Sequence, residues 1–222
     1  MNADGTNTKE LTNDEVNDSP NWSPDGRQIV FSAKKGDAIT SDIYVMNADG
    51  SNIRRLTDHV AIDGSPAWAP DGRLIAFFST RINDSNSELW VMNADGSSQR
   101  PLLPDIEYLE NAPTWSPDGH YIAFAGRYEL FVAAVDCSSI TRLTSSEDYQ
   151  VAHPSWSPDG RLIAFDALVD YRDRFIYVIE PGGANPRQLA ADGTYPVWSP
   201  GQPPPRFRGS LRPLGGHECR RF

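Results

Sequence analysis

Trp22-Ser23-Pro24-Asp25-Gly26 (WSPDG) is the stretch that decides the fold, because it recurs along the chain. It returns unchanged at Trp115 and Trp156, as WAPDG at Trp68, and in the broken form WSPGQ at Trp198. The successive tryptophans lie 46, 47, 41 and 42 residues apart. Recurrence at a fixed spacing of some tens of residues marks a repeat architecture, so the period has to be assigned before any single element.

Each repeat contains four short strand signals. A Pro-x-Trp segment comes first, followed by segments like Arg27–Phe31 and Asp42–Met46, and the fourth ends at a leucine such as Leu56. Short runs of β-branched and aromatic residues between Gly, Pro, Asn and Asp predict β-strands. Equivalent segments begin at Arg73, His120 and Arg161 for the second signal, and the fourth ends at Leu102, Leu143 and Leu189.

The middle strands are apolar on both faces, as in Leu74-Ile75-Ala76-Phe77, so both faces must be covered. Blades stacked face to face around an axis meet this need, and four strands per repeat of this length is the signature of a β-propeller. We therefore predict an all-β fold, a β-propeller of four-stranded antiparallel blades. It would have four complete repeats and an incomplete fifth blade, in a partial or open ring.

The repeated phrases also carry a family resemblance. The string P-x-W-S-P-D-G-x-x-I-A-F, followed by D-I-Y-V-M-N-A-D-G-S and L-T, resembles the repeat of TolB-like propellers, also called WD40-like or PD40 repeats. The resemblance covers residues 1–200 and implies a periplasmic or extracellular propeller used for protein binding. In some relatives such a propeller precedes a peptidase domain of the prolyl oligopeptidase (S9) type, and fold alone does not transfer an activity.

The repeats set the expected domain organisation. The propeller is expected over residues 1–200, with repeats at 13–57, 58–103, 104–144 and 145–190 and partial repeats at 1–12 and 191–200. Residues 201–222 hold five Arg and one Glu, against 15 Lys plus Arg and 29 Asp plus Glu in residues 1–200. We expect this tail to be disordered, either as out-of-frame or spliced sequence or as a genuine basic tail. The repeat pattern also places residue 1 inside a third strand, so we expect a fragment of a longer protein.

The repeated turn and tryptophan residues are expected to be structural. Pro, Asp and Gly suit a type I turn followed by a left-handed glycine, and Asp side chains ordinarily bond to their own turn backbone rather than to a metal. Each indole is expected to wedge between blades, with an exposed ligand platform as the alternative. These structural positions are Trp22, Asp25, Gly26, Trp68, Asp71, Gly72, Trp115, Asp118, Gly119, Trp156, Asp159, Gly160 and Trp198.

The variable connections from each fourth strand to the next first strand contain no Lys or Arg. If the blades close, their carboxylates would surround the mouth of the channel and attract a basic protein or peptide. The alternative is that acidic loops only keep a repetitive β-protein soluble. The candidate binding residues are Asp14, Glu15, Asp18, Asp58, His59, Asp63, Asp105, Glu107, Tyr108, Glu110, Glu147, Asp148, Tyr149, His153, Asp192 and Tyr195.

Composition and missing motifs narrow the function classes. A formal net charge of −10 argues against nucleic-acid binding, and no apolar run is long enough for membrane insertion. No G-x-S-x-G, H-E-x-x-H or Gly-rich phosphate loop occurs, so we expect no enzyme activity, metal or cofactor in this chain. His59 and His153 would have to meet at the channel mouth to form a metal or acid/base pair. We therefore predict a non-catalytic binding scaffold, or alternatively the propeller of an S9-type peptidase without its hydrolase domain.

Overall fold

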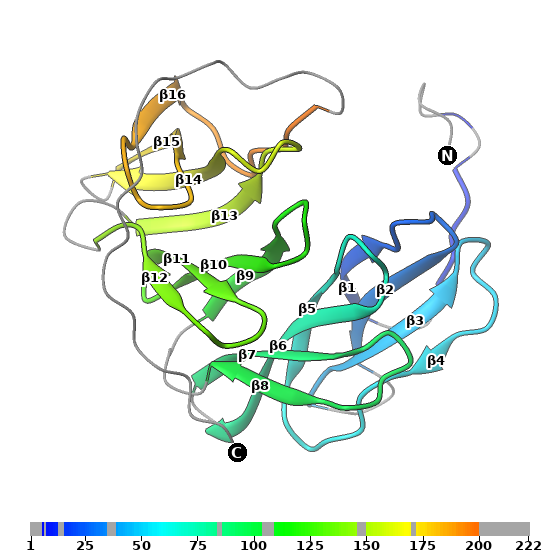
Figure 1. Ribbon diagram of the computed structural model, residues 1–222. Helices are drawn as coiled ribbons and strands as arrows, with labels where there is room; N and C mark the ends of the chain where they lie inside the picture. The colour runs from blue at the N-terminus through cyan, green and yellow to red at the C-terminus, as the bar shows by residue number, and fades with distance from the viewer. Residues whose placement is uncertain are drawn as a thin grey trace.

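The computed structural model describes residues 6, 8–12, 16–34, 39–83, 86–103, 109–145, 150–169 and 172–199. Within these residues, sixteen strands form four separate four-stranded sheets, and every strand pairs antiparallel with its neighbour in the chain. Figure 1 shows the four sheets as successive blades. The predicted all-β, four-stranded blade architecture is therefore confirmed, with its period set by the WSPDG repeat.

The strand bounds match the four sequence signals in each repeat. The blades, in chain order, are β1 (Val16–Trp22), β2 (Gln28–Lys34), β3 (Asp42–Asn47) and β4 (Arg54–Arg55); β5 (Asp63–Trp68), β6 (Leu74–Asn83), β7 (Asn86–Asn93) and β8 (Arg100–Leu103); β9 (Leu109–Trp115), β10 (Tyr121–Gly126), β11 (Glu129–Ala134) and β12 (Ile140–Arg142); β13 (Gln150–Trp156), β14 (Ile163–Val169), β15 (Asp173–Ile179) and β16 (Arg187–Ala191).

The WSPDG turns are held by their own side chains. The N–H of Gly26 donates to the Ser23 carbonyl at 2.9 Å, and Gly26 has a φ of +68°. Asp25 Oδ1 accepts from the Ser23 hydroxyl at 2.7 Å and from the Arg27 N–H at 3.0 Å. Asp71, Asp118 and Asp159 repeat the contact to the N–H two residues on. This end of every blade is therefore a self-contained Asx-type turn, as the residue types predict.

The first strand of each blade packs on the blade before it. Strand β5 lies against β1, β2 and β3, and β9 and β13 repeat the arrangement with the next two blades. Trp68, Trp115 and Trp156 are buried in these junctions, each among apolar side chains from two blades. Trp115 Nε1 donates to the Ala67 carbonyl at 3.0 Å. Trp68 and Trp156 differ from Trp115, since neither of their Nε1 atoms has a hydrogen-bond partner within the described residues.

A second contact recurs at every junction between blades. A leucine at the end of the fourth-strand segment lies against the β3–β4-type turn of the next blade: a Cβ added to Gly96 would lie 2.9 Å from the Leu56 carbonyl oxygen. The third blade has Cys137 in place of this glycine, and it adopts the same left-handed conformation, with a φ of +62°. The turn thus keeps its shape and carries the strain of a non-glycine residue. The four pairs are Leu11 with Gly50, Leu56 with Gly96, Leu102 with Cys137, and Leu143 with Gly183.

The four blades follow an arc, with the first and last blades at its two ends (Figure 1). Leu11 packs on the first blade, whereas Trp198 packs on the fourth, where its Nε1 donates to the Ser155 carbonyl at 2.9 Å. These two partial repeats therefore rest on different blades. Trp22 is 56% exposed and Leu189 is 47% exposed, although their equivalents in the other repeats are buried, because no neighbouring blade covers them.

The first strands share a bulge directly before their proline. Ser19, Ser65 and His153 have φ values of 51°, 51° and 47°, and the pairing with the second strand shifts register at each of them. Tyr195 occupies the same place before Pro196 and has a φ of 54°. A positive φ is uncommon for non-glycine residues, and bulges of this kind re-aim side chains. The pre-proline side chains of these four repeats therefore leave the regular alternation of their strands.

Candidate functional site

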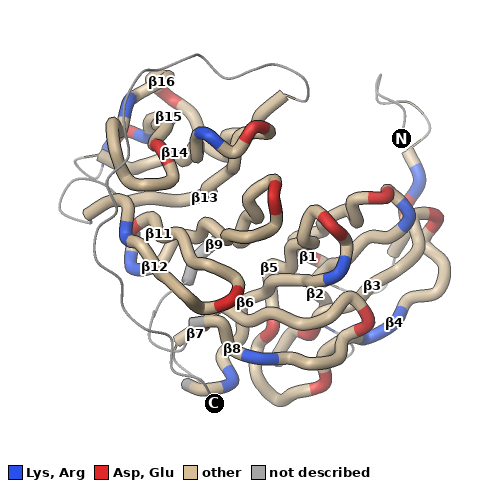
Figure 2. Tube along the Cα trace, in the orientation of Figure 1, with Lys and Arg blue, Asp and Glu red and all other residues tan. Residues whose placement is uncertain are grey.

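The two ends of the blades differ in how much they vary. The β1–β2 and β3–β4 turns and their equivalents repeat nearly the same sequence and the same Asx bonds. The connections from second to third strand and from fourth to first strand emerge together at the opposite end, which we call the variable end. Figure 2 shows that Lys, Arg, Asp and Glu are distributed over all four blades. Loops that vary on a rigid scaffold are where binding residues are usually found.

Many of the candidate binding residues lie outside the described residues. These are Asp14, Glu15, Asp105, Glu107, Tyr108, Glu147, Asp148 and Tyr149, together with the side chain of Glu110. The described candidates are Asp18, Asp58, His59, Asp63, His153, Asp192 and Tyr195. Asp18 is exposed and accepts from the N–H of Ser19, and Asp192 is exposed with a φ of 60°.

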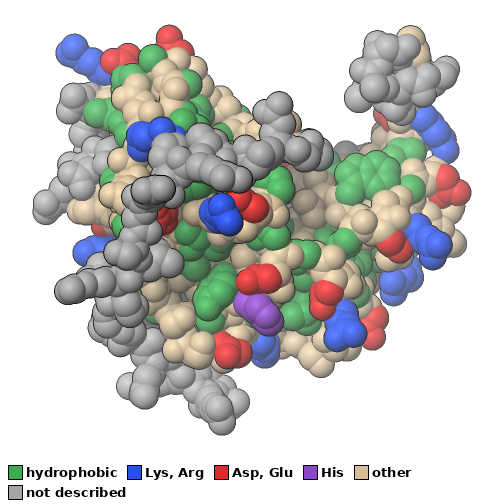
Figure 3. Space-filling model, turned by 45° about the horizontal axis from the view of Figure 1, so that its top comes forward, with side chains coloured by type: hydrophobic (Ala, Val, Ile, Leu, Met, Phe, Trp, Pro, Cys, Tyr) green, Lys and Arg blue, Asp and Glu red, His purple; other side chains and the backbone are tan. Residues whose placement is uncertain are grey.

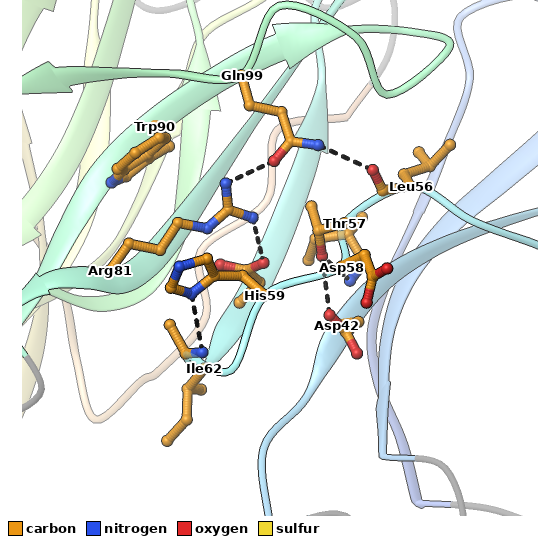
Figure 4. Close-up of polar contacts among 12 residues, drawn as sticks. Asp42, Leu56, Thr57, Asp58, His59, Ile62, Arg81, Trp90 and Gln99 are labelled. Atoms are coloured by element: carbon orange, nitrogen blue, oxygen red, sulfur yellow. Dashed lines mark hydrogen bonds and ion pairs between the residues drawn. The ribbon is translucent and has the colours of Figure 1, made fainter.

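A buried ion pair joins two strands of the second blade near the variable end, and Gln99 connects it to the first blade. Asp63 is fully buried, and its Oδ2 lies 2.6 Å from Nη2 of Arg81, whose side chain is 11% exposed. Arg81 Nη1 donates to Gln99 Oε1 at 2.5 Å, and Gln99 Nε2 donates in turn to the Leu56 carbonyl of the first blade at 3.0 Å (Figure 4). The guanidinium carbon also lies 5.0 Å from the centre of the Trp90 ring. Asp63 is therefore a structural anion rather than part of an exposed acidic surface.

A second network surrounds Arg55. Its guanidinium contacts Asp42 Oδ2 at 2.7 Å and Asp58 Oδ1 at 2.8 Å. Thr57, which is fully buried, accepts from the Ile43 N–H and donates to Asp42 Oδ1 (Figure 4). Burial raises the pKa of the Asp42 carboxyl, although Arg55 acts in the opposite direction. One cation thus serves two carboxylates, so this group keeps a net negative charge while Asp58 remains 87% exposed.

His59 is placed beside this network but has its own partner. Its Nδ1 accepts from the N–H of Ala61 at 3.1 Å.

On strand β7, burial raises the pKa of Glu88, even though the Trp90 indole and the Ile82 N–H donate to its carboxylate. Three third strands begin with such a buried carboxylate, namely Asp42, Glu88 and Glu129.

His153 and Tyr195 come together at the fourth blade. Their ring centroids are 3.7 Å apart, and both are bound by Asp166, which is fully buried. Asp166 Oδ1 contacts His153 Nδ1 at 2.7 Å and accepts from the Tyr195 N–H at 3.3 Å, and its Oδ2 contacts Arg174 Nη1 at 2.5 Å. His59 and His153 therefore take separate partners. Within the described residues, no three His, Cys, Asp or Glu side chains are grouped as metal ligands would be.

Figure 3 shows one face of the molecule, on which hydrophobic side chains gather in the middle and side chains of both charges stand around them. Near the variable end, Arg55, Arg81 and Arg174 each bind a carboxylate. Such pairing weakens a one-signed field. Asp192 and Asp58 are exposed carboxylates at the variable end, and Asp58 shares the Arg55 guanidinium with Asp42.

Sequence reasoning did not single out Asp166 or Asp42 as parts of a polar network. The signal for Asp166 is the last letter of RLIAFD, where the other repeats have Ser32, Phe78 and Ala125. A carboxylate in a position that is otherwise apolar or small predicts a buried partner. Asp42 opens a third strand, and its position shows a carboxylate in three of the four repeats. The described residues contain no helix long and apolar enough to cross a membrane.

Comparisons with known proteins agree with this architecture. The family described as PD40, TolB beta propeller domain, matches residues 1–202. No curated protein matches the chain. The structure of TolB from Acinetobacter baumannii is 19% identical with a TM-score of 0.73; the match covers 85% of this chain and 47% of that one, so this chain spans about half of its length. A protein assigned as TolB from Agrobacterium tumefaciens is 21% identical with a TM-score of 0.65, over 80% of this chain and 81% of that one.

The fold is shared beyond these proteins. A structure from an analysis of two prolyl endopeptidases is 15% identical with a TM-score of 0.61, over 81% of this chain and 30% of that one. Likeness at this level of identity concerns the fold alone. The match to the family over nearly the whole chain decides the assignment: the chain belongs to the TolB β-propeller (PD40) family.

Proposed function

We propose that this propeller is a non-catalytic scaffold that binds a protein or peptide, preferably a basic one, through its variable end. The observation that carries the proposal is the contrast between the two ends of the blades. One end is fixed by repeated Asx turns, whereas the other carries connections that differ in every repeat, and its fourth-to-first connections contain no Lys or Arg. The exposed Asp58 and Asp192 are available there for electrostatic recognition.

The TolB resemblance supports a periplasmic or extracellular location for this role. The alternative is that the chain serves as the propeller of an S9-type peptidase, which the match to a prolyl endopeptidase structure favours. A downstream coding sequence with a serine nucleophile motif would select that alternative. In either case the variable end is the proposed contact surface.

The test compares removal of the same charge from the two ends. Asp58→Asn/Asp192→Asn neutralises two carboxylates at the variable end, and Asp49→Asn/Asp95→Asn neutralises two at the turn end. Asparagine keeps an Asx oxygen, so the turns are expected to persist. Proteins are captured from an extract of the native host at about 50 mM and about 300 mM salt, since surface attraction is screened as salt rises. We expect capture to fall with the first variant and with added salt, while equal effects of the two variants would refute the proposal.

A further inference from the structure

Three aliphatic side chains stand exposed together at the variable end of the second blade. Val60 is 87% exposed, Ile62 is 48% exposed and Ile82 is 53% exposed. Single exposed aliphatic residues are ordinary, but a group of them on a rigid frame indicates an interaction surface. We refer to Val60, Ile62 and Ile82 as the aliphatic patch.

Strand pairing places Ile62 and Ile82 on one face. Asp63 pairs with Ser79 across β5 and β6, and Ile62 continues the pairing, because its carbonyl accepts from the Thr80 N–H and its own N–H donates to Thr80 Oγ1. Val60 lies in the bend before β5, two residues from Ile62; both are exposed, whereas Ala61 and Asp63 are buried. On β6, Arg81 turns inward and Ile82 outward, because side chains alternate along a strand.

Buried contacts on the inward side of the same segments fix the position of the aliphatic patch. The inward neighbours Asp63 and Arg81 form the buried ion pair that ties these two strand ends to each other and, through Gln99, to the first blade. The Ser41 hydroxyl donates to the Asp63 carbonyl at 2.8 Å, which fixes the same segment from the first blade. An apolar surface that is already ordered loses little conformational entropy on binding.

The charges around the patch are complementary to a cation. Arg81 is committed to Asp63, and Arg55 is shared between Asp42 and Asp58. The connection 57–65 adds no Lys or Arg, and Asp58 is 87% exposed beside it. An apolar centre with a polar rim of one sign is the usual anatomy of a specific contact.

We propose that the aliphatic patch docks an extended protein segment in which aliphatic residues alternate with Lys or Arg. Residues two apart in an extended segment point to the same side, which matches the spacing of Val60 and Ile62. The intervening Lys or Arg would then be free to reach Asp58. This inference rests on the proposed binding role of the variable end and names the chemistry of the partner.

The experiment uses a fluorescein-labelled octapeptide of alternating Lys and Val, followed by fluorescence anisotropy with the full chain. Ile62→Ser/Ile82→Ser removes two members of the patch. Ile53→Ser is the control, since Ile53 is also an exposed aliphatic residue, at 43%, but lies in the β3–β4 turn at the other end. We expect the patch variant to weaken binding about tenfold, as loss of a central apolar contact does, and the control to leave it unchanged. Circular dichroism checks that both variants fold.

Two further peptides separate this inference from the proposed function. An octapeptide of alternating Lys and Ser keeps the charge without the aliphatic contacts, and one of alternating Glu and Val does the reverse. Tightest binding of the Lys-Val peptide supports the inference. Equal binding of the Lys-Val and Lys-Ser peptides, lost in Asp58→Asn/Asp192→Asn but not in the patch variant, overturns the inference and leaves the proposed function standing. Binding that none of these substitutions affects overturns both.

Discussion

Replacing Arg81 by leucine tests whether the buried ion pair stabilises the second blade and its contact with the first. In this variant the Asp63 carboxylate, which is fully buried, loses the guanidinium that contacts it at 2.6 Å, and Gln99 Oε1 loses its donor. Removing one partner of a buried pair costs about 3–5 kcal/mol, because the remaining charge stays uncompensated. For a chain of this size each kcal/mol lowers the melting temperature by about 2–4 °C, so we expect a decrease of about 10 °C.

The double substitution Asp63→Val/Arg81→Leu gives the sharper comparison. Asp63 Oδ1 and Arg81 Nε have no hydrogen-bond partner among the described residues, so the wild-type pair is incompletely satisfied. Replacing both partners with apolar side chains is then expected to bring stability within about 1 kcal/mol of the wild type. Arg73→Leu is the control, because Arg73 lies 3.8 Å from Asp71 with 85% of its side chain exposed, and such pairs contribute about 0–1 kcal/mol.

The assay is equilibrium urea unfolding followed by circular dichroism, with thermal melting as a second measurement. A loss below about 1 kcal/mol for Arg81→Leu would refute the reasoning, since it would mean that Asp63 is solvated or finds another partner. A double variant at least as unstable as Arg81→Leu alone would refute it as well. In that case the two side chains would act independently rather than as a pair.

Two more predictions concern the turns. In urea unfolding, Gly96→Ala should lower the free energy of unfolding more than Gly26→Ala does. Both glycines have a positive φ, which costs an alanine about 1–2 kcal/mol. Only at Gly96 would the new Cβ also collide with Leu56. Equal losses would show that the junction relaxes. The Ser116 hydroxyl and the His120 N–H lower the pKa of Asp118 in the folded state. The ionised Asp118 therefore stabilises the folded protein above the unfolded pKa of about 3.9, and this stabilisation is lost as pH falls through the lower folded pKa. Asp118→Asn should therefore flatten the decline of the urea midpoint below about pH 4, and an unchanged pH profile would contradict this assignment.

The sequence predicts the fold well because each repeat contains its own strand and turn signals. The positions of Trp22, Trp68 and Trp115 set the period, and strands apolar on both faces imply stacked blades. The ends of the arc could not be predicted in the same way. Whether Trp22 is covered depends on a neighbouring blade, and its 56% exposure is a property of the assembly rather than of its motif.

The candidate site was less predictable than the fold. Loop composition placed Asp63 among the exposed carboxylates, but β6 extends to Asn83 and turns Arg81 inward to pair with it. No local pattern encodes that pairing, since the two residues lie on the neighbouring strands β5 and β6 and meet only when these strands pair. The contact between His153 and Tyr195 is also long-range, because the two residues belong to successive repeats.

The repeated contact between a leucine and the turn of the next blade affects how the chain unfolds. Leu11, Leu56, Leu102 and Leu143 each contact the turn of the following unit, so each unit is joined to the next one along the arc. Stability in such an array is close to a sum of unit and interface terms, as in a one-dimensional Ising chain. The outermost units, bounded on one side only, should open first and exchange their amide hydrogens fastest. Gain or loss of a whole unit during evolution would leave every remaining interface intact.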